Sequence, residues 1–328
     1  MKAMWLATFT VLTTTLGLYG QAQAPPTPTE TVAPDIPGVV ASGTKVEVIQ
    51  SGFRGTEGPI GLADGSLIFT ETQANRITKI DKDGSTSTFL ENTNGSNGLA
   101  FDAKGRLISV QTTPGQTKIG VIHPKGSEAT LADNFEGKPF GRPNDLVVDK
   151  KGGVYFTDPG PNPAAGQAPA AAPPLPAAVY YVPPGGKATK IAGGIERPNG
   201  ILLSPDEKVL YVNNTFGEHL LAFDVAADGS VTNRRNFAKY EKVTPTTTGV
   251  TSGADGLAVD SEGRIYCAAA GGVQVFGGDG KHLGTIPVSV RAQNLAFAGA
   301  DKKTLYIVGS GAAFKVRLLA EGYRDRAK

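Results

Sequence analysis

The stretch NGLAFDAKGRLISV at residues 97–110 contains the pattern that decides the fold. A polar residue and a glycine lead into a short apolar run, and a turn at Lys104 and Gly105 connects this run to a second one. Two short apolar runs joined by a turn of this kind predict an antiparallel β-hairpin. Related stretches occur along the whole chain, so this hairpin is one copy of a repeat.

Six copies of the pattern can be aligned by their first residue. They are EGPIGLADGSLIFT (57–70), NGLAFDAKGRLISV (97–110), NDLVVDKKGGVYFT (144–157), NGILLSPDEKVLYV (199–212), DGLAVDSEGRIYCA (255–268) and NLAFAGADKKTLYIV (294–308). Their starting points lie 39 to 56 residues apart, and a period near 40 is typical of a four-stranded propeller blade. The sequence therefore predicts an all-β protein, a six-bladed β-propeller with four-stranded antiparallel blades around a central channel.

The propeller is expected to span residues 45–319. Little chain follows Arg317, so we expect Lys45 to Ile49 to complete the last blade and close the ring, which removes its exposed edges. Residues 25–44, rich in Pro and Thr, are expected to form an extended leader, and residues 320–328 a C-terminal tail. A Pro/Ala-rich insertion covers residues 159–176 and is either a mobile loop without function or a lid over the channel.

Residues 1–24 have the features of a cleavable signal peptide. Lys2 carries the positive charge, a largely apolar run follows, and Ala22 and Ala24 form a small-x-small cleavage site. The apolar run is shorter than the roughly 20 residues that a membrane anchor needs, and threonines interrupt it. The mature protein is therefore predicted to be secreted or periplasmic.

Composition and motifs argue against several classes of function. The chain has 32 Lys and Arg against 30 Asp and Glu, which gives no electrostatic reason to bind nucleic acid or an anionic membrane. Cys267 is the single cysteine, so no disulfide framework is expected. The sequence contains neither a Gly-x-Ser-x-Gly nucleophile elbow nor a phosphate-binding loop. We expect a monomer or a weak homodimer.

The first residues of the six copies point to a metal site. They occupy equivalent places at the start of the innermost strands, so all six should converge on one mouth of the channel. They are Glu57, Asn97, Asn144, Asn199, Asp255 and Asn294. Two carboxylates and four amides, without Lys, Arg or His, suit a hard divalent cation. Ca²⁺ is the first choice, with Zn²⁺, Mn²⁺ and Mg²⁺ as alternatives.

A simpler interpretation of these residues is that Asn-Gly and Asp-Gly pairs only make turns. That interpretation accounts for some of the copies. It does not account for Glu57, because Glu is a poor turn former.

At these positions the sequence resembles the senescence-marker-protein/gluconolactonase/luciferin-regenerating-enzyme-like family, and it is most similar to gluconolactonases. The motifs that carry the resemblance are EGP (57–59), NGLAFD (97–102), RPNDLVV (142–148), YFTDP (155–159), RPNGI (197–201) and ADGLAVD (254–260). The resemblance extends from about Val48 to Arg317. It implies a six-bladed propeller with one catalytic divalent ion. By motif, Glu57, Asn199 and Asp255 are implied to be metal ligands, and Asn144 a ligand or a substrate contact.

The expected activity is metal-dependent hydrolysis of a lactone, a sugar lactone such as gluconolactone being the first candidate. The cation would polarise the carbonyl, and Asp255, or with less support Glu57, would take a proton from the attacking water. Arg142, Asn144, Asp158 and Asn97 are the candidate substrate-binding residues, although a surface salt bridge is an equal explanation for Arg142. Two alternatives are an organophosphate-hydrolysing propeller and a non-catalytic binding module with a structural Ca²⁺.

Overall fold

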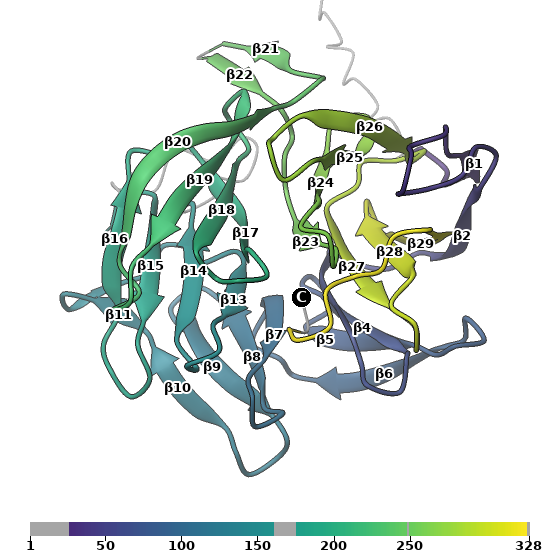
Figure 1. Ribbon diagram of the computed structural model, residues 1–328. Coiled ribbons are helices and arrows are strands. Elements are labelled where there is room, and N and C mark those ends of the chain that lie inside the picture. Colours follow the sequence, from purple (N-terminus) through teal and green to yellow (C-terminus); the bar gives the residue numbers. More distant parts are fainter. Residues whose placement is uncertain (1–25, 161–174, 248, 327–328) are drawn as a thin grey trace, which may run out of the picture.

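The computed structural model describes residues 26–160, 175–247 and 249–326. In this part of the chain every regular element is a β-strand, and the strands form six antiparallel sheets of four or five strands arranged as a ring (Figure 1). The predicted six-bladed β-propeller is confirmed. The signal peptide predicted at 1–24 and most of the 159–176 insertion lie outside the described residues. No helix in the described part is long and apolar enough to cross a membrane.

The first three blades follow one another along the chain, each with its innermost strand first. Blade 1 is β3 (Thr56–Gly61), β4 (Leu67–Glu71), β5 (Arg76–Ile80) and β6 (Thr86–Glu91). Blade 2 is β7 (Ser96–Phe101), β8 (Leu107–Gln111), β9 (Lys118–His123) and β10 (Ala129–Ala132). A small pair, β11 (Asn134–Phe135) and β12 (Lys138–Pro139), precedes blade 3, which is β13 (Leu146–Val148), β14 (Val154–Asp158), β15 (Ala178–Val182) and β16 (Thr189–Gly193).

The remaining blades complete the ring. Blade 4 is β17 (Pro198–Leu203), β18 (Val209–Asn214), β19 (His219–Val225) and β20 (Val231–Lys239). The hairpin β21 (Thr244–Thr246) and β22 (Gly249–Thr251) follows, and then blade 5, which is β23 (Leu257–Val259), β24 (Ile265–Ala269), β25 (Gly272–Phe276) and β26 (His282–Pro287). Blade 6 is β27 (Asn294–Ala298), β28 (Thr304–Gly309), β29 (Ala312–Arg317), β2 (Lys45–Ser51) and the short β1 (Thr31–Val32).

The apolar core lies between the blades. Six clusters of buried side chains each combine residues from neighbouring blades, for example Ile60 and Ile68 of blade 1 with Leu99 and Leu107 of blade 2. The second strands, such as β4 and β8, are buried along their whole length because they have a neighbouring blade on each face. This explains why the second half of each repeat is a continuous apolar run rather than an alternating one.

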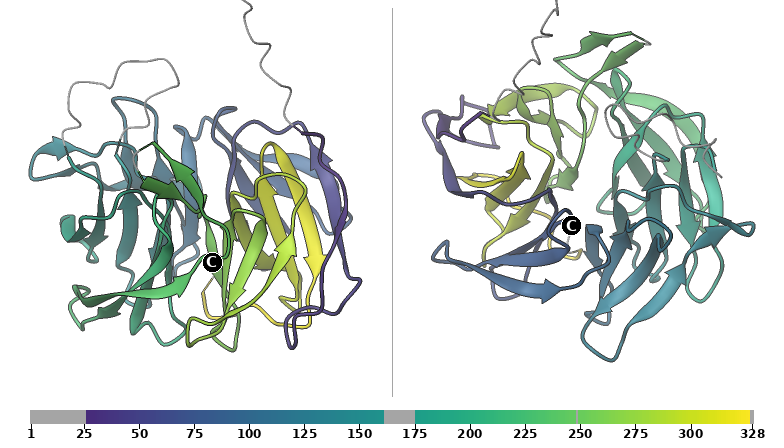
Figure 2. Two further views of the ribbon diagram at one scale, coloured as in Figure 1. Left: turned by 90° about the horizontal axis from the view of Figure 1, so that it is seen from above. Right: turned by 180° about the vertical axis from the view of Figure 1, so that it is seen from behind.

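Strand β2 closes the ring by pairing with β29, as predicted for Lys45 to Ile49. Val46 is paired with Val316 and Val48 with Phe314, 270 residues or so further along the chain. The first strands lie against the last blade in both views of Figure 2. The first and last parts of the chain are thus held in one sheet.

The segment before β2 does more than lead into the ring. Strand β1 pairs with β2, and Ile36 bridges to Val40. Ala33, Ile36, Val39 and Val40 are all buried in the same cluster as blades 5 and 6. The Pro/Thr-rich leader therefore packs on the propeller through its few apolar residues. Composition alone did not indicate that these residues would be buried.

The segment after β29 crosses the end of the channel at which the inner strands finish (Figure 1). The Tyr323 N–H donates to the carbonyl of Val259 in blade 5, over 3.2 Å, and the Tyr323 hydroxyl donates to Pro205 O beyond β17, over 2.9 Å. Arg326 is buried and bonded to Leu203 O and to the Glu207 carboxylate of blade 4. The C-terminal tail is therefore packed across this mouth, and the other mouth is the one toward which the repeat's leading residues point.

The closing strand gives a first test of the fold. Val46 is fully buried, so Val46→Asp places an unpaired charge in the interface and should lower the free energy of unfolding by roughly 3 kcal/mol or more. The neighbouring Glu47 forms only a half-exposed ion pair with Lys315, at 3.3 Å, so Glu47→Gln should cost less than about 1 kcal/mol. Urea denaturation measures both values, and equal stability of the two variants would show that β2 does not hold the ring closed.

Candidate functional site

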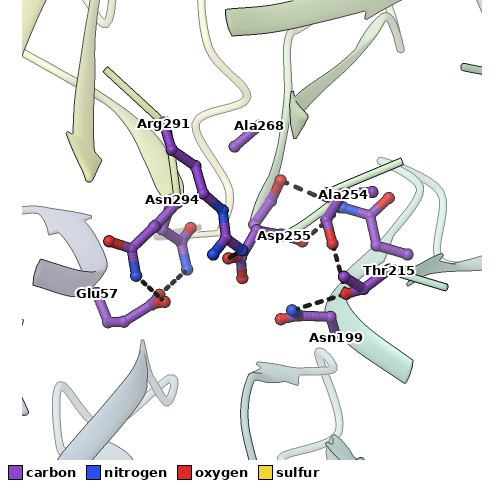
Figure 3. Close-up of polar contacts among 12 residues, drawn as sticks. Glu57, Asn199, Thr215, Ala254, Asp255, Ala268, Arg291 and Asn294 are labelled. Atoms are coloured by element: carbon purple, nitrogen blue, oxygen red, sulfur yellow. Dashed lines mark hydrogen bonds and ion pairs between the residues drawn. The ribbon is translucent and has the colours of Figure 1, made fainter. Parts of the chain in front are cut away.

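The six leading residues of the repeat meet around the channel. Each is at most 8% exposed, so all six are buried although all are polar. Figure 3 shows Glu57, Asn199, Asp255 and Asn294 facing a common space, with Arg291 reaching between Asn294 and Asp255. The convergence expected from the repeat is therefore present. In the described part of the chain no three His, Cys, Asp or Glu side chains cluster as a metal group, so a cation here would need the amide oxygens.

A glycine after the leading residue lets neighbouring inner strands approach one another closely. A Cβ on Gly200 would overlap the carbonyl oxygen of Asp255, and one on Gly58 would overlap that of Asn97. The Gly200 N–H donates to the same Asp255 carbonyl, over 3.0 Å. The pairs Asn97-Gly98 and Asn199-Gly200 lie inside strands β7 and β17, so the interpretation of Asn-Gly pairs as simple turns is wrong for blades 2 and 4.

Side chains of the second strands fix the leading residues of the next blade. The Thr70 hydroxyl donates to Asn97 O over 3.0 Å, and the Thr157 hydroxyl donates to Asn199 O over 2.6 Å. In blade 4 an amide has this role, since Asn213 Nδ2 donates to Asp255 O over 2.5 Å. Asn97, Asn199 and Asp255 are thus positioned by the preceding blade as well as by their own.

Glu57 is a buried carboxylate held by two amides of blade 6. Gln293 Nε2 donates to Glu57 Oε1 over 3.1 Å, and Asn294 Nδ2 donates to Oε2 over 3.2 Å (Figure 3). Burial, and next the negative charge of Asp255, raise the pKa of Glu57 far above its ordinary value. Two carboxylates that repel one another in a buried space are the arrangement that a bound cation would relieve.

Asp255 is the second buried carboxylate, and it pairs with an arginine. Arg291 Nη2 donates to Asp255 Oδ2 over 2.8 Å, and the Arg291 side chain is 56% exposed. Burial raises the pKa of Asp255, and the positive charge of Arg291 opposes that rise. Asp255 is therefore buried behind the side chain of Arg291, which is itself exposed at the open mouth.

Among the residues that the structure describes, two buried side-chain amide oxygens have no hydrogen-bond donor. These are Asn97 Oδ1 and Asn199 Oδ1. The Asn199 amide is oriented by its own nitrogen, which donates to the Thr215 hydroxyl over 3.1 Å, and Figure 3 shows its oxygen turned toward Glu57. A buried acceptor without a donor is costly unless a ligand satisfies it. With Glu57 and Asp255 these oxygens form a donor set that fits a hard divalent cation.

The other predicted substrate residues lie beside this set. Asp158 ends strand β14, and its two oxygens accept backbone N–H groups from Gly141 over 2.7 Å and Arg142 over 2.9 Å, both before β13, and from Gly160 over 2.9 Å. These bonds hold the loop that carries Arg142 at the mouth. A direct substrate contact by Asp158, Asn97, Asn144 or Arg142 stays a prediction.

Three further residues of the site, Arg291, Gln293 and Thr215, were not predicted from the sequence. Arg291 and Gln293 lie before the weakest copy of the repeat, and Thr215 lies in a loop after β18. Gln293 has no counterpart in the other blades, whereas Thr215 corresponds to Thr72 and Thr112 after β4 and β8, and Arg291 lies one residue further from its leading residue than Arg142 and Arg197 do. Their roles follow only from the contacts with Asp255, Glu57 and Asn199.

The fold and the oxygen-lined channel define a six-bladed propeller with a candidate site for a divalent cation. The signature of the SMP-30/gluconolactonase/LRE-like region matches residues 55–311. The chain belongs to this family, as its motifs suggested.

Relatives with assigned names support this classification. A gluconolactonase of Zymomonas mobilis subsp. mobilis is 30% identical over 322 residues, covering 87% of this chain and 84% of that protein. A pentonolactonase of Haloferax volcanii is 25% identical over 274 residues, covering 82% and 86%. A gluconolactonase structure from Xanthomonas campestris has a TM-score of 0.73 at 29% identity and covers 89% of this chain and 98% of its own. A calcium-binding regucalcin from Agrobacterium tumefaciens (TM-score 0.65, 19% identity, 86% and 98% covered) shares the fold.

The close approach of the strands gives a test of how the site is positioned. Gly200→Ala should force β17 away from Asp255 and lower the free energy of unfolding by about 1–3 kcal/mol. Gly278 has ordinary backbone angles and no atom closer than 4.0 Å to an added Cβ, so Gly278→Ala should change stability by less than about 0.5 kcal/mol. Thermal or urea unfolding compares the two, and a Gly200→Ala protein as stable as the Gly278→Ala protein would contradict the packing argument.

Proposed function

We propose that this protein is a divalent-cation-dependent lactonase of the gluconolactonase type. The observation that supports it most is the pair of buried carboxylates, Glu57 and Asp255, beside unpaired amide oxygens. This pair lies in the channel of a chain related over most of its length to a gluconolactonase. Ca²⁺ is the cation we favour, because the donors are all oxygen and include several neutral amides.

The ligand set is Glu57, Asn199 and Asp255, with Asn97 and Asn144 as further oxygen donors. When bound, a divalent cation supplies Lewis-acid polarisation of the lactone carbonyl and compensation for the negative charge that develops on its oxygen. Gln293 and Asn294 orient the Glu57 carboxylate, and Thr215 orients the Asn199 amide, so these groups need little rearrangement on binding.

Asp255 is the general base of the proposed reaction. A water oxygen bonds to the lactone carbonyl carbon while Asp255 accepts a proton from that water. The bond between the carbonyl carbon and the ring oxygen then breaks, and the proton passes to the ring oxygen, which leaves as a hydroxyl. Arg291, bonded to Asp255 Oδ2, favours the ionised form that can accept a proton. Arg142 and Asn144, at the same mouth, are proposed to orient the substrate.

Export belongs to the same proposal. Residues 1–24 are proposed to be removed as a signal peptide, so that the enzyme acts outside the cytoplasm. N-terminal sequencing of the secreted or periplasmic protein would place the cleavage near Ala24, and an intact N-terminus on protein recovered from the cytoplasm would contradict it.

The decisive experiment removes and restores the cation. Chelator-treated protein should lose hydrolysis of a lactone panel that includes gluconolactone, and one of Ca²⁺, Mg²⁺, Mn²⁺ or Zn²⁺ should restore it. Glu57→Gln and Asp255→Asn should each lower kcat/KM by at least about 10²-fold with the fold retained, as circular dichroism would show. Glu47→Gln, far from the channel, is the matched control and should keep wild-type activity.

Other outcomes of that experiment separate the alternatives. Hydrolysis of an organophosphate ester but of no lactone, lost in the same two variants, would establish the phosphotriesterase alternative. A large rise in melting temperature on adding a cation, without hydrolysis of any ester, would establish a binding module whose ion is structural. Activity that is unaffected by chelation would exclude the cation-dependent mechanism.

The orientation of Asn199 gives a separate prediction. Thr215→Val keeps the shape of the side chain but removes the hydroxyl that accepts from Asn199 Nδ2 and donates to Ala254 O. We expect the affinity for Ca²⁺, measured by calorimetry, to fall by about 10-fold or more. Residues that orient a metal-binding side chain affect the metal affinity nearly as strongly as that side chain does. The exposed Thr88→Val is the control. Equal affinities in the two variants would show that Asn199 is not a ligand.

A further inference from the structure

We propose that the natural substrate is a lactone that carries an additional anionic group, a carboxylate or a phosphate, bound by Arg142, Arg197 and Arg291 at the mouth of the channel. This inference rests on the proposed lactonase function and adds the class of substrate. A neutral sugar lactone would offer these arginines only hydroxyl groups.

The three arginines lie in the loops that lead into the inner strands of their blades, and two of them hold equivalent places. Arg142 and Arg197 each lie two residues before a leading asparagine, and Arg291 lies three residues before Asn294. They enter from blades 3, 4 and 6. Because the leading residues converge on the axis, the loops that precede them converge as well.

Hydrogen bonds connect the loops of the arginines with the proposed site. Arg291 is bonded to Asp255 Oδ2, at 2.8 Å. The Arg197 carbonyl accepts from the Thr215 N–H over 3.0 Å, and the Thr215 hydroxyl donates to Ala254 O, next to Asp255, over 2.7 Å. The Arg142 N–H donates to Asp158, which follows Thr157, and the Thr157 hydroxyl donates to Asn199 O. The three arginines therefore lie in loops that adjoin the ring of leading residues at the open mouth.

Arg197 is held in place without a carboxylate. Its guanidinium lies over the ring of Phe216, 5.5 Å from the ring centre, and its backbone N–H donates to Asn214 Oδ1 over 3.1 Å. Phe216 is itself 49% exposed, which is unusual for a large apolar side chain. In the part of the chain that the structure describes, Arg197 forms no ion pair, although its side chain is partly buried.

Arg142 and Arg291 also keep donors available. Among the described residues Arg142 has no ion pair, and the bond from its loop to Asp158 uses the backbone N–H. Arg291 uses only Nη2 for Asp255. Asp158 is already satisfied by three backbone N–H groups, so it does not need these arginines as counter-charges.

An oxyanion is the ligand that this arrangement suits. Guanidinium groups present planar pairs of N–H donors that match the oxygens of a carboxylate or a phosphate. Partly buried donors without an acceptor are unfavourable, and an anionic ligand would supply the acceptors and the charge at once. The Arg197 ring contact keeps that guanidinium fixed in advance, which reduces the entropy lost on binding.

The test compares three aldonolactones that differ in charge. Cation-loaded protein is assayed with glucono-δ-lactone (neutral), glucaro-lactone (free carboxylate) and 6-phosphoglucono-δ-lactone (phosphate). At least one anionic lactone should have a kcat/KM about 10-fold or more above that of the neutral one, and this preference should shrink as salt is added. The anionic lactone with the higher kcat/KM then shows whether the arginines bind a carboxylate or a phosphate. An equal or higher kcat/KM for the neutral lactone would overturn the proposal.

Substitution of the arginine separates recognition from folding. Arg197→Gln should lower kcat/KM about 10-fold or more for the preferred anionic lactone, mainly through KM, and less than about 3-fold for glucono-δ-lactone. Arg197→Lys, which keeps the charge but not the planar pair of N–H donors, provides a second variant should the first fail to fold. Arg235→Gln, which removes an exposed ion pair with Asp224 on blade 4, is the control and should change none of the three. Equal losses on all three lactones would mean that Arg197 is only structural.

Failure of the lactonase proposal itself would be recognisable. If no lactone is hydrolysed with any cation, calorimetry can still compare binding of 6-phosphogluconate and glucarate, which carry two anionic groups, with that of gluconate, which carries one. Tighter binding of a doubly anionic ligand in wild type but not in Arg197→Gln would support the arginine site alone. Equal binding of all three ligands would overturn it.

Discussion

Neighbouring inner strands pack backbone against backbone around the axis, and the site depends on this contact. Gly58 and Gly200 leave no room for a side chain because the carbonyl of the next blade's leading residue occupies that place. The second strands reinforce the contact, since the side chains of Thr70 and Asn213 donate to the same two carbonyls. Polar residues that would cost free energy in a core are thereby held at fixed positions around a small space.

The same geometry creates the electrostatic conflict that defines the site. Burial and the negative charge of Asp255 raise the pKa of Glu57, and burial and the negative charge of Asp145 raise the pKa of Asp255. Amides of blade 6 and Arg291 only partly offset this cost. Under the proposed function, a divalent cation bound to these two carboxylates and to the two unpaired amide oxygens would stabilise the folded state, and its binding would then be coupled to the integrity of the channel.

The ends of the chain complete the structure in ways that the repeat does not describe. Residues before β2 bury Ile36 and Val40 against blades 5 and 6, and residues after β29 carry Arg326 into blade 4. These segments make single, unrepeated contacts with partners far away in sequence. Their composition is that of a leader and a tail, and only the packed structure shows that both belong to the propeller.

The sequence alone determined the blades, the closing strand and the six positions that meet at the channel. It could do so because a strand has a local hydrophobic pattern and because equivalent places in a repeat must be equivalent in a ring. The tertiary structure decided which side chains from other blades bond to the residues at those positions. Gln293 and Asn294 bond to Glu57 across 236 and 237 residues of chain, and Arg291 pairs with Asp255. Such contacts occur once, between blades, and depend on side-chain directions, so no periodic pattern records them.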